Sequence, residues 1–229
     1  MLRAVIFDFN GVLIDDEPIH LEMFQKVLKD EGLSLDAKDY YEQYLGFDDR
    51  GCFKAYYKRT GHILSDTALE DLVQRKAHYY RESIENRMVV FPGVKQLIRE
   101  LSSHIPLAIA SGALRSEIEM ILEKLHLRKC FRGIVSAEDV NEGKPSPETF
   151  NKALDLLNQL AADGSIDPSE CLAVEDSREG IRAAHGARLK CLAVTNSHSE
   201  KELSEADSVV HSLEQVNLNF LEKLLSTSI

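Results

Sequence analysis

The sequence lacks the cysteine pattern of a disulfide framework or of a zinc site. Its four cysteines, at positions 52, 130, 171 and 191, are far apart, with no CxxC pair and no histidine cluster at zinc-finger spacing. We therefore expect reduced, mostly buried thiols, and the cytoplasm is the expected location.

Long hydrophobic runs and an excess of positive charge are also missing. The apolar run from Ala4 to Phe7 is interrupted by Asp8, which is too early for a signal-peptide core, and no stretch is long enough to span a membrane. The formal net charge is −11, a value that repels nucleic acid and anionic membranes. We expect neither as a partner, so an anionic substrate would need a local positive site.

What the sequence does contain is a series of short apolar runs separated by helical patterns. With 229 residues, 44% of them hydrophobic, the chain can bury a sizeable core. The runs are typical of parallel strands buried on both faces. They lie at 3–9, 106–110, 171–174 and 190–194, with a weaker one at 133–136, and the helices are expected at 93–103, 114–127, 147–160, 177–186 and 212–225. This alternation predicts a three-layer α/β domain with a mostly parallel sheet.

Residues 16–88 differ from this pattern because they show amphipathic helical spacing and no convincing strand. An example is the series Ile19, Met23, Val27 and Leu28. We therefore predict a small helical domain at 16–88, inserted into a core formed by 1–15 and 89–229.

Polar residues that could carry chemistry follow the predicted strands directly. Ligands of open α/β sheets bind at the carboxyl ends of the strands. Here those ends carry Asp8-Phe-Asn10-Gly11, Ser111-Gly112 and Glu175-Asp176, while Lys144 lies in a loop that leads into a helix.

In that order, Asp8, Ser111, Lys144 and the Glu175-Asp176 pair resemble the four motifs of the haloacid dehalogenase superfamily. The run from Val174 to Ala184 is similar to the subgroup of sugar-phosphate phosphatases and β-phosphoglucomutase. The resemblance covers essentially the whole chain. It implies a Rossmann-like core, and it implies that the helical insert is a mobile cap.

The resemblance also implies roles for these residues. Asp8 would be a nucleophile that forms an aspartyl-phosphate. Mg²⁺ would be held by Asp8, the backbone carbonyl of Asn10 and Asp176, with Glu175 beside them. Phosphate oxygens would be bound by Ser111, by Lys144 and by backbone amides near Gly11 and Gly112.

Each of these residues also has a simpler interpretation when taken alone. Asp8 could cap a turn, and Ser111 followed by glycine is ordinary turn chemistry. Lys144 could be a solvated loop lysine. The Glu175-Asp176-Ser177 run could be a helix N-cap with acids near the positive end of the dipole, which is compatible with a functional role.

Asn10 departs from the family pattern, which has an acid/base aspartate at this position. An amide cannot shuttle a proton at neutral pH. Three interpretations follow: a slow phosphohydrolase that has no acid or takes one from elsewhere, such as His20 or Glu17; an engineered variant that traps substrate; or a binding protein that has lost turnover.

The predicted cap offers candidate substrate-binding residues. These are His20, Arg50 and Lys76, and the segment Gly46 to Arg50 resembles a cap loop of β-phosphoglucomutase-like proteins. Simpler alternatives are a satisfied helix residue for His20 and a solvated helix face for Lys76. The tyrosines of this region are expected to pack at helix surfaces.

The main functional hypothesis is a monomeric, cytoplasmic, Mg²⁺-dependent phosphatase or phosphomutase acting on a small phosphorylated metabolite such as a sugar phosphate. The alternative is a catalytically impaired protein that binds or senses a phosphorylated ligand. A metal-free haloacid dehalogenase would also begin with an aspartate nucleophile, but the acidic pair and Lys144 favour a magnesium phosphoryl site.

Overall fold

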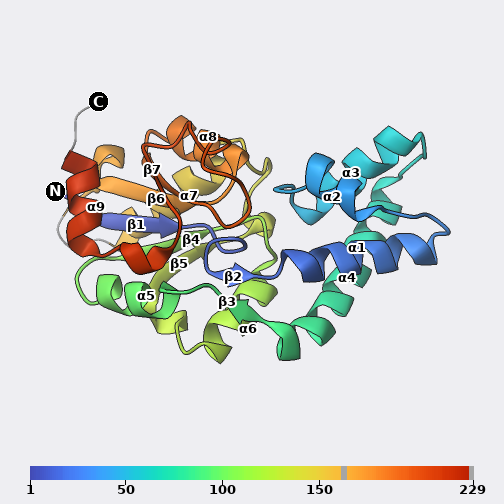
Figure 1. Cartoon of the computed structure of the whole chain (residues 1–229), viewed down its shortest axis with the longest axis horizontal. Helices are drawn as coiled ribbons and strands as arrows, with labels where there is room; N and C mark the ends of the chain where they lie inside the picture. The colour runs from blue at the N-terminus through green and yellow to red at the C-terminus, as the bar shows by residue number, and fades with distance from the viewer. Residues whose placement is uncertain (161–163, 227–229) are drawn as a thin grey trace. The chain divides into compact units, whose positions relative to one another are not determined.

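The computed structural model describes residues 1–160 and 164–226, and the chain divides into two compact units. Unit 1 comprises Met1–Ile14 and Val90–Ile229, and unit 2 comprises Asp15–Val89. The two connections between them carry the short strands β2 (Ile14–Asp15) and β3 (Val89–Val90), which pair with each other (Figure 1). In the part of the chain that the structure describes, no helix is long and apolar enough to cross a membrane.

Unit 1 is built on a six-stranded parallel sheet with the order β5-β4-β1-β6-β7-β8. The strands are β1 (Ala4–Phe7), β4 (Leu107–Ala110), β5 (Phe131–Val135), β6 (Cys171–Glu175), β7 (Lys190–Val194) and β8 (Ser208–Val210). The first strand is central, with β4 on one side and β6 on the other. The predicted α/β class and parallel sheet are therefore confirmed.

The helices of unit 1 form layers on both faces of this sheet. Right-handed crossovers place helices on opposite faces when the strands that they connect progress in opposite directions. The helices α5 (Val94–Ser102) and α6 (Arg115–Lys124) lead outward from β1 to β5. The helices α7 (Glu148–Leu160) and α8 (Arg178–Gly186) lead back across the sheet to β6 and β7. The first pair therefore lies on one face and the second on the other.

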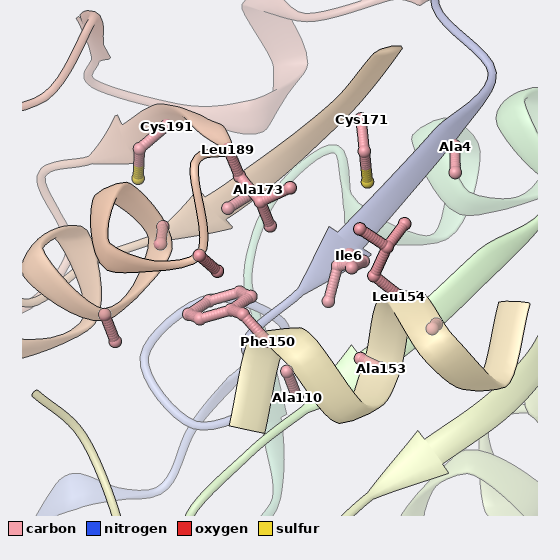
Figure 2. Packing of buried hydrophobic residues seen from close by; sticks show 14 of the residues in the cluster. Ala4, Ile6, Ala110, Phe150, Ala153, Leu154, Cys171, Ala173, Leu189 and Cys191 are labelled. Atoms are coloured by element: carbon pink, nitrogen blue, oxygen red, sulfur yellow. The ribbon is translucent and has the colours of Figure 1, made fainter. Parts of the chain in front are cut away.

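Small side chains let α7 approach the sheet closely. Ala4, Ala110 and Ala173 point from three strands into a buried cluster, into which Phe150 of α7 inserts (Figure 2). All residues of β1, β4 and β6 are buried, which explains their nearly continuous apolar sequences. Burial of this kind fixes the register of the strands and thereby the positions of the residues that follow them.

Two details of unit 1 differ from the sequence-based prediction. Strand β8 was not predicted, because it has only three residues, two of them half-buried, at the edge of the sheet. The C-terminal helix α9 spans Leu218–Ser226 and does not begin at position 212. A short 3-10 helix occupies Leu213–Gln215, capped by the Ser212 side chain, and the extended backbone of Val216 separates it from α9.

Unit 2 is helical, and its helices begin at side-chain caps where the sequence provides them. It contains α1 (Glu17–Asp30), α2 (Ala37–Gln43), α3 (Asp49–Thr60) and α4 (Asp66–Arg87). Asp36, Asp48 and Ser65 accept hydrogen bonds from the first turns of α2, α3 and α4. All four residues of the amphipathic series that begins at Ile19 are buried in α1.

Candidate active site

The residues that follow the strands of unit 1 converge at the carboxyl edge of the sheet. Asp8 follows β1, Ser111 follows β4, and Glu175 is the last residue of β6. Since β1 lies between β4 and β6, these ends are adjacent. The backbone N–H of Asp8 donates to the carbonyl of Val174 at 2.9 Å, which extends the ladder between β1 and β6 by one residue.

Lys144 joins this edge from the loop before α7. Its Nζ lies 2.9 Å from Oδ1 of Asp8 and 2.5 Å from Oε1 of Glu175, and its side chain is only 9% exposed. Burial lowers the pKa of this ammonium, but the two carboxylates outweigh burial and hold the pKa above its usual value. Lys144 is therefore a buried cation between two acids and not a solvated loop residue.

Glu175 is held by donors at the start of α8. Its Oε2 accepts hydrogen bonds from the N–H groups of Asp176 and Ser177, at 3.2 and 3.3 Å, and from the Ser177 hydroxyl at 3.0 Å. Gly180 provides the room for this carboxylate, because a β-carbon there would lie about 2 Å from its oxygens, the nearest at 2.0 Å. Glu175 thus contacts Lys144 through Oε1 and is held at the start of α8 through Oε2.

Three carboxylates lie close enough to share a cation. One oxygen each of Asp8, Glu175 and Asp176 lie within 4.8 Å of one another. Burial raises the pKa of Asp8 to about 7 against the lowering effect of Lys144. Burial, with Glu175 and Asp8 nearby, also raises the pKa of Asp176 well above its usual value. Oxygen donors carrying excess negative charge are the ligand set of a hard divalent cation such as Mg²⁺, so these residues fit that ion.

Asn10 and Gly11 form a turn directly beside these acids. Gly11 has a φ of 73°, and a β-carbon at this position would lie 1.9 Å from Oδ2 of Asp176. The Ser111 hydroxyl donates to Oδ1 of Asn10 at a long 3.4 Å and accepts from the N–H of Ala113 at 3.1 Å. Gly112, between these two donors, is exposed. The amide at position 10 therefore lies at the site, where it can accept and donate hydrogen bonds but carries no titratable proton.

The predicted cap residues all belong to unit 2. The Lys76 side chain is completely buried: its Nζ lies 2.7 Å from Oδ1 of Asp49 and also donates to Nδ1 of His20. Because Nδ1 of His20 is an acceptor there, Nε2 donates to Oδ2 of Asp16 at 3.0 Å. Lys76 is therefore not on a solvated face. Arg50 is half-exposed and pairs with Glu70.

The loop that follows β7 also contacts the site, although none of the motifs found in the sequence lies in it. Asn196 donates from Nδ2 to the Gly11 carbonyl at 2.7 Å, and the Ser197 hydroxyl donates to Oδ2 of Asp176. Nδ1 of His198 donates to the Asp176 carbonyl at 3.1 Å. Ligands of open α/β sheets bind at the carboxyl ends of the strands, and this loop follows the carboxyl end of β7, which pairs with β6. The same rule could therefore have pointed to this loop.

Comparisons with known proteins agree with one another on the family and the fold of this chain. A family model for haloacid dehalogenase-like hydrolases matches residues 5–194. The chloroplastic 5-amino-6-(5-phospho-D-ribitylamino)uracil phosphatase of Arabidopsis thaliana is 28% identical over 228 residues, 99% of this chain but 58% of that protein. This chain therefore spans less than two thirds of that relative. The phosphorylated carbohydrates phosphatase of Thermotoga maritima is 27% identical over 98% of this chain and 100% of that protein.

Among solved structures, CbbY from Rhodobacter sphaeroides has been crystallised in complex with phosphate. It is 25% identical, with a TM-score of 0.86 over 97% of this chain and 100% of the other. An aspartate-to-asparagine mutant of the same protein, in complex with xylulose-(1,5)bisphosphate, is 26% identical, with a TM-score of 0.85 over 96% and 99% of the two chains.

Proposed function

Because the chain belongs to the haloacid dehalogenase-like hydrolases, we propose that it transfers the phosphoryl group of a small phosphorylated metabolite to Asp8. The observation that carries this proposal is the buried contact of Lys144 with Asp8 and Glu175, next to Asp176. A sugar phosphate is the proposed substrate, and the phosphatase names of two relatives support a phosphorylated small molecule.

In the proposed reaction, a carboxylate oxygen of Asp8 attacks phosphorus, and the bond from phosphorus to the bridging oxygen of the substrate breaks. Lys144 balances the charge that develops on the transferring group, and the Ser111 hydroxyl donates to its oxygens. Water or a second substrate hydroxyl then releases the phosphoryl group from Asp8. Attack by water makes the protein a phosphatase, and attack by a hydroxyl makes it a mutase.

Asp8, Asp176 and the backbone carbonyl of Asn10 are the proposed ligands of Mg²⁺, with Glu175 next to them. When bound, the ion would offset the repulsion between the Asp8 carboxylate and an incoming phosphate. The chain's own contribution is to hold the three carboxylates in place, with Glu175 anchored at the start of α8.

The missing acid at position 10 makes the proposed enzyme slow. The leaving oxygen then takes its proton from water or from a group other than residue 10, because an amide has none to give at neutral pH. Loss of a positioned acid/base typically lowers the rate by about 10²- to 10⁴-fold. Substrate contacts by His20, Arg50 and Lys76 stay predictions, as do the cytoplasmic location and the monomeric state.

A second candidate function is the binding of a phosphorylated ligand without turnover. Asn10 favours it, because phosphate recognition by Ser111 and Lys144 does not depend on a proton shuttle. The bisphosphate complex of an asparagine-substituted CbbY supports the view that a protein of this fold can retain a ligand after an aspartate-to-asparagine substitution.

Phosphate release tests both functions. We expect Asn10→Asp to increase Mg²⁺-dependent release from an aryl phosphate and a panel of sugar phosphates by about 10²-fold or more, because it restores the acid/base. Asp8→Asn, combined with Asn10→Asp, is the control and should abolish the gain. Equal activity of the chain and its Asn10→Asp variant would indicate another proton donor. Ligand binding with no turnover in either protein would favour the binding function.

A further inference from the structure

The loop after β7 contacts both segments that carry the proposed metal ligands. It reaches the turn after β1 through the bond from Asn196 to the Gly11 carbonyl, and it reaches the end of β6 through the bonds of Ser197 and His198 to Asp176. All of these residues belong to unit 1. Three consecutive residues, 196–198, thus donate the bonds that tie together the ends of adjacent strands.

The Ser197 bond determines which oxygen of Asp176 is available. Oδ2 accepts the hydroxyl and also lies against Gly11, where a β-carbon would approach to 1.9 Å. Among the described residues, none donates a hydrogen bond to Oδ1. A carboxylate fixed through one oxygen presents the other in a defined direction, which is how hydrogen-bonded partners orient a metal ligand.

The Asn196 bond restrains the other ligand segment. Gly11 carries the carbonyl that accepts from Asn196, and its Cα adjoins the peptide that contains the Asn10 carbonyl. With a φ of 73°, Gly11 is in a region that few other residues adopt, so the turn needs an external contact to hold a single geometry.

We propose that Ser197 and Asn196 are positioning residues that set the affinity of the Asp8–Asp176 site for Mg²⁺, Ser197 by orienting the Asp176 carboxylate and Asn196 by fixing the Asn10-Gly11 turn. This inference rests on the proposed function, because it assumes that the site binds the ion. It goes beyond the metal ligands themselves, because neither residue is expected to touch the ion.

The test is Mg²⁺ binding to the full chain, measured by calorimetric titration without substrate. We expect Ser197→Ala to weaken Mg²⁺ binding about 10- to 100-fold, the usual effect of removing a partner of a metal ligand. Ser197→Thr keeps the hydroxyl and should restore the affinity. Ser199→Ala is the matched control, because this hydroxyl is in the same loop but donates to Glu202 at 2.7 Å.

Unfolding of each variant in EDTA shows whether it is folded before metal is added. Asn196→Ala provides an independent variant and should also weaken binding.

If this chain binds Mg²⁺ and both alanine variants bind it equally well, the inference is wrong while the proposed function stands. If Ser197→Thr binds as poorly as Ser197→Ala, the hydroxyl is not the reason and the inference is also wrong. If the unmodified chain binds no Mg²⁺, the proposed metal site and this inference fail together.

Discussion

The acidic site requires glycine at position 11, where a hydrogen atom stands in place of a side chain. The residue combines a left-handed backbone conformation with close contact to the Asp176 carboxylate. Either requirement alone would favour glycine, and together they allow almost nothing else. The same reasoning applies to Gly180, which leaves room for Glu175 at the start of α8.

We predict that Gly11→Ala destabilises the chain far more than Gly61→Ala. Both glycines have a φ of 73°, but a β-carbon at Gly61 meets nothing within 4 Å. Gly61→Ala should therefore cost only the backbone strain, about 1–2 kcal/mol of unfolding free energy. Gly11→Ala adds the clash with Asp176 and should also lose Mg²⁺ binding. Urea unfolding and metal titration measure the two effects, and similar costs for both variants would contradict this account.

At the scale of the element, the first turn of α8 combines capping with support of the site. The Ser177 hydroxyl accepts from the N–H of Gly180 at 3.0 Å and donates to Oε2 of Glu175 at 3.0 Å. A helix N-terminus stabilises nearby negative charge, so the first turn of α8 also supports the Glu175 carboxylate that contacts Lys144. The N-cap reading of this segment and the functional one are therefore both compatible with the structure.

We predict that Ser177→Ala costs more than Ser65→Ala, although both serines cap helices. Ser65 accepts from Ala68 at 3.2 Å at the exposed start of α4, and its loss should cost about 1 kcal/mol. Ser177→Ala also removes a hydrogen bond to a buried carboxylate, which adds about 1.5–3 kcal/mol. Hydrogen exchange of peptides from α8 and α4 measures each opening free energy separately. Equal losses would mean that the bond to Glu175 contributes nothing.

At the scale of the whole molecule, negative charge is concentrated where the chain is proposed to bind an anionic substrate. The net charge is −11, and three acids share one edge of the sheet with Lys144. All of the proposed metal ligands lie in unit 1. A divalent cation is therefore expected to act on the stability of this unit directly and on unit 2 only through general screening.

We predict that Mg²⁺ at about 100 times its dissociation constant raises the unfolding free energy of unit 1 by about 2.7 kcal/mol, because it binds only the folded site. The measurement is thermal unfolding in MgCl₂, compared with thermal unfolding in NaCl of equal ionic strength, which controls for screening. In the Asp176→Asn variant, the two salts should stabilise the chain equally. An equal response of Asp176→Asn and the unmodified chain would place the ion elsewhere.

Much of the fold was predictable because the strands are short, apolar and separated by helices. The runs around Ile6, Ile109 and Ala173 all became central strands, and the predicted helices that follow them formed within a few residues. Strand β8 was missed because an edge strand of three residues carries almost no hydrophobic signal. The start of α9 was misplaced because a capped 3-10 turn mimics a helix start.

The sequence by itself determined most of the strands and helices and the acids and lysine near the strand ends, because these depend on local patterns and on the rule for parallel sheets. Its motifs also indicated the family. Only the tertiary structure decided that Lys144 is buried between Asp8 and Glu175, and that Asn196 and Ser197 reach Gly11 and Asp176. Such contacts join residues more than 20 positions apart. They depend on strand register and on the path of the loops, which no local pattern encodes.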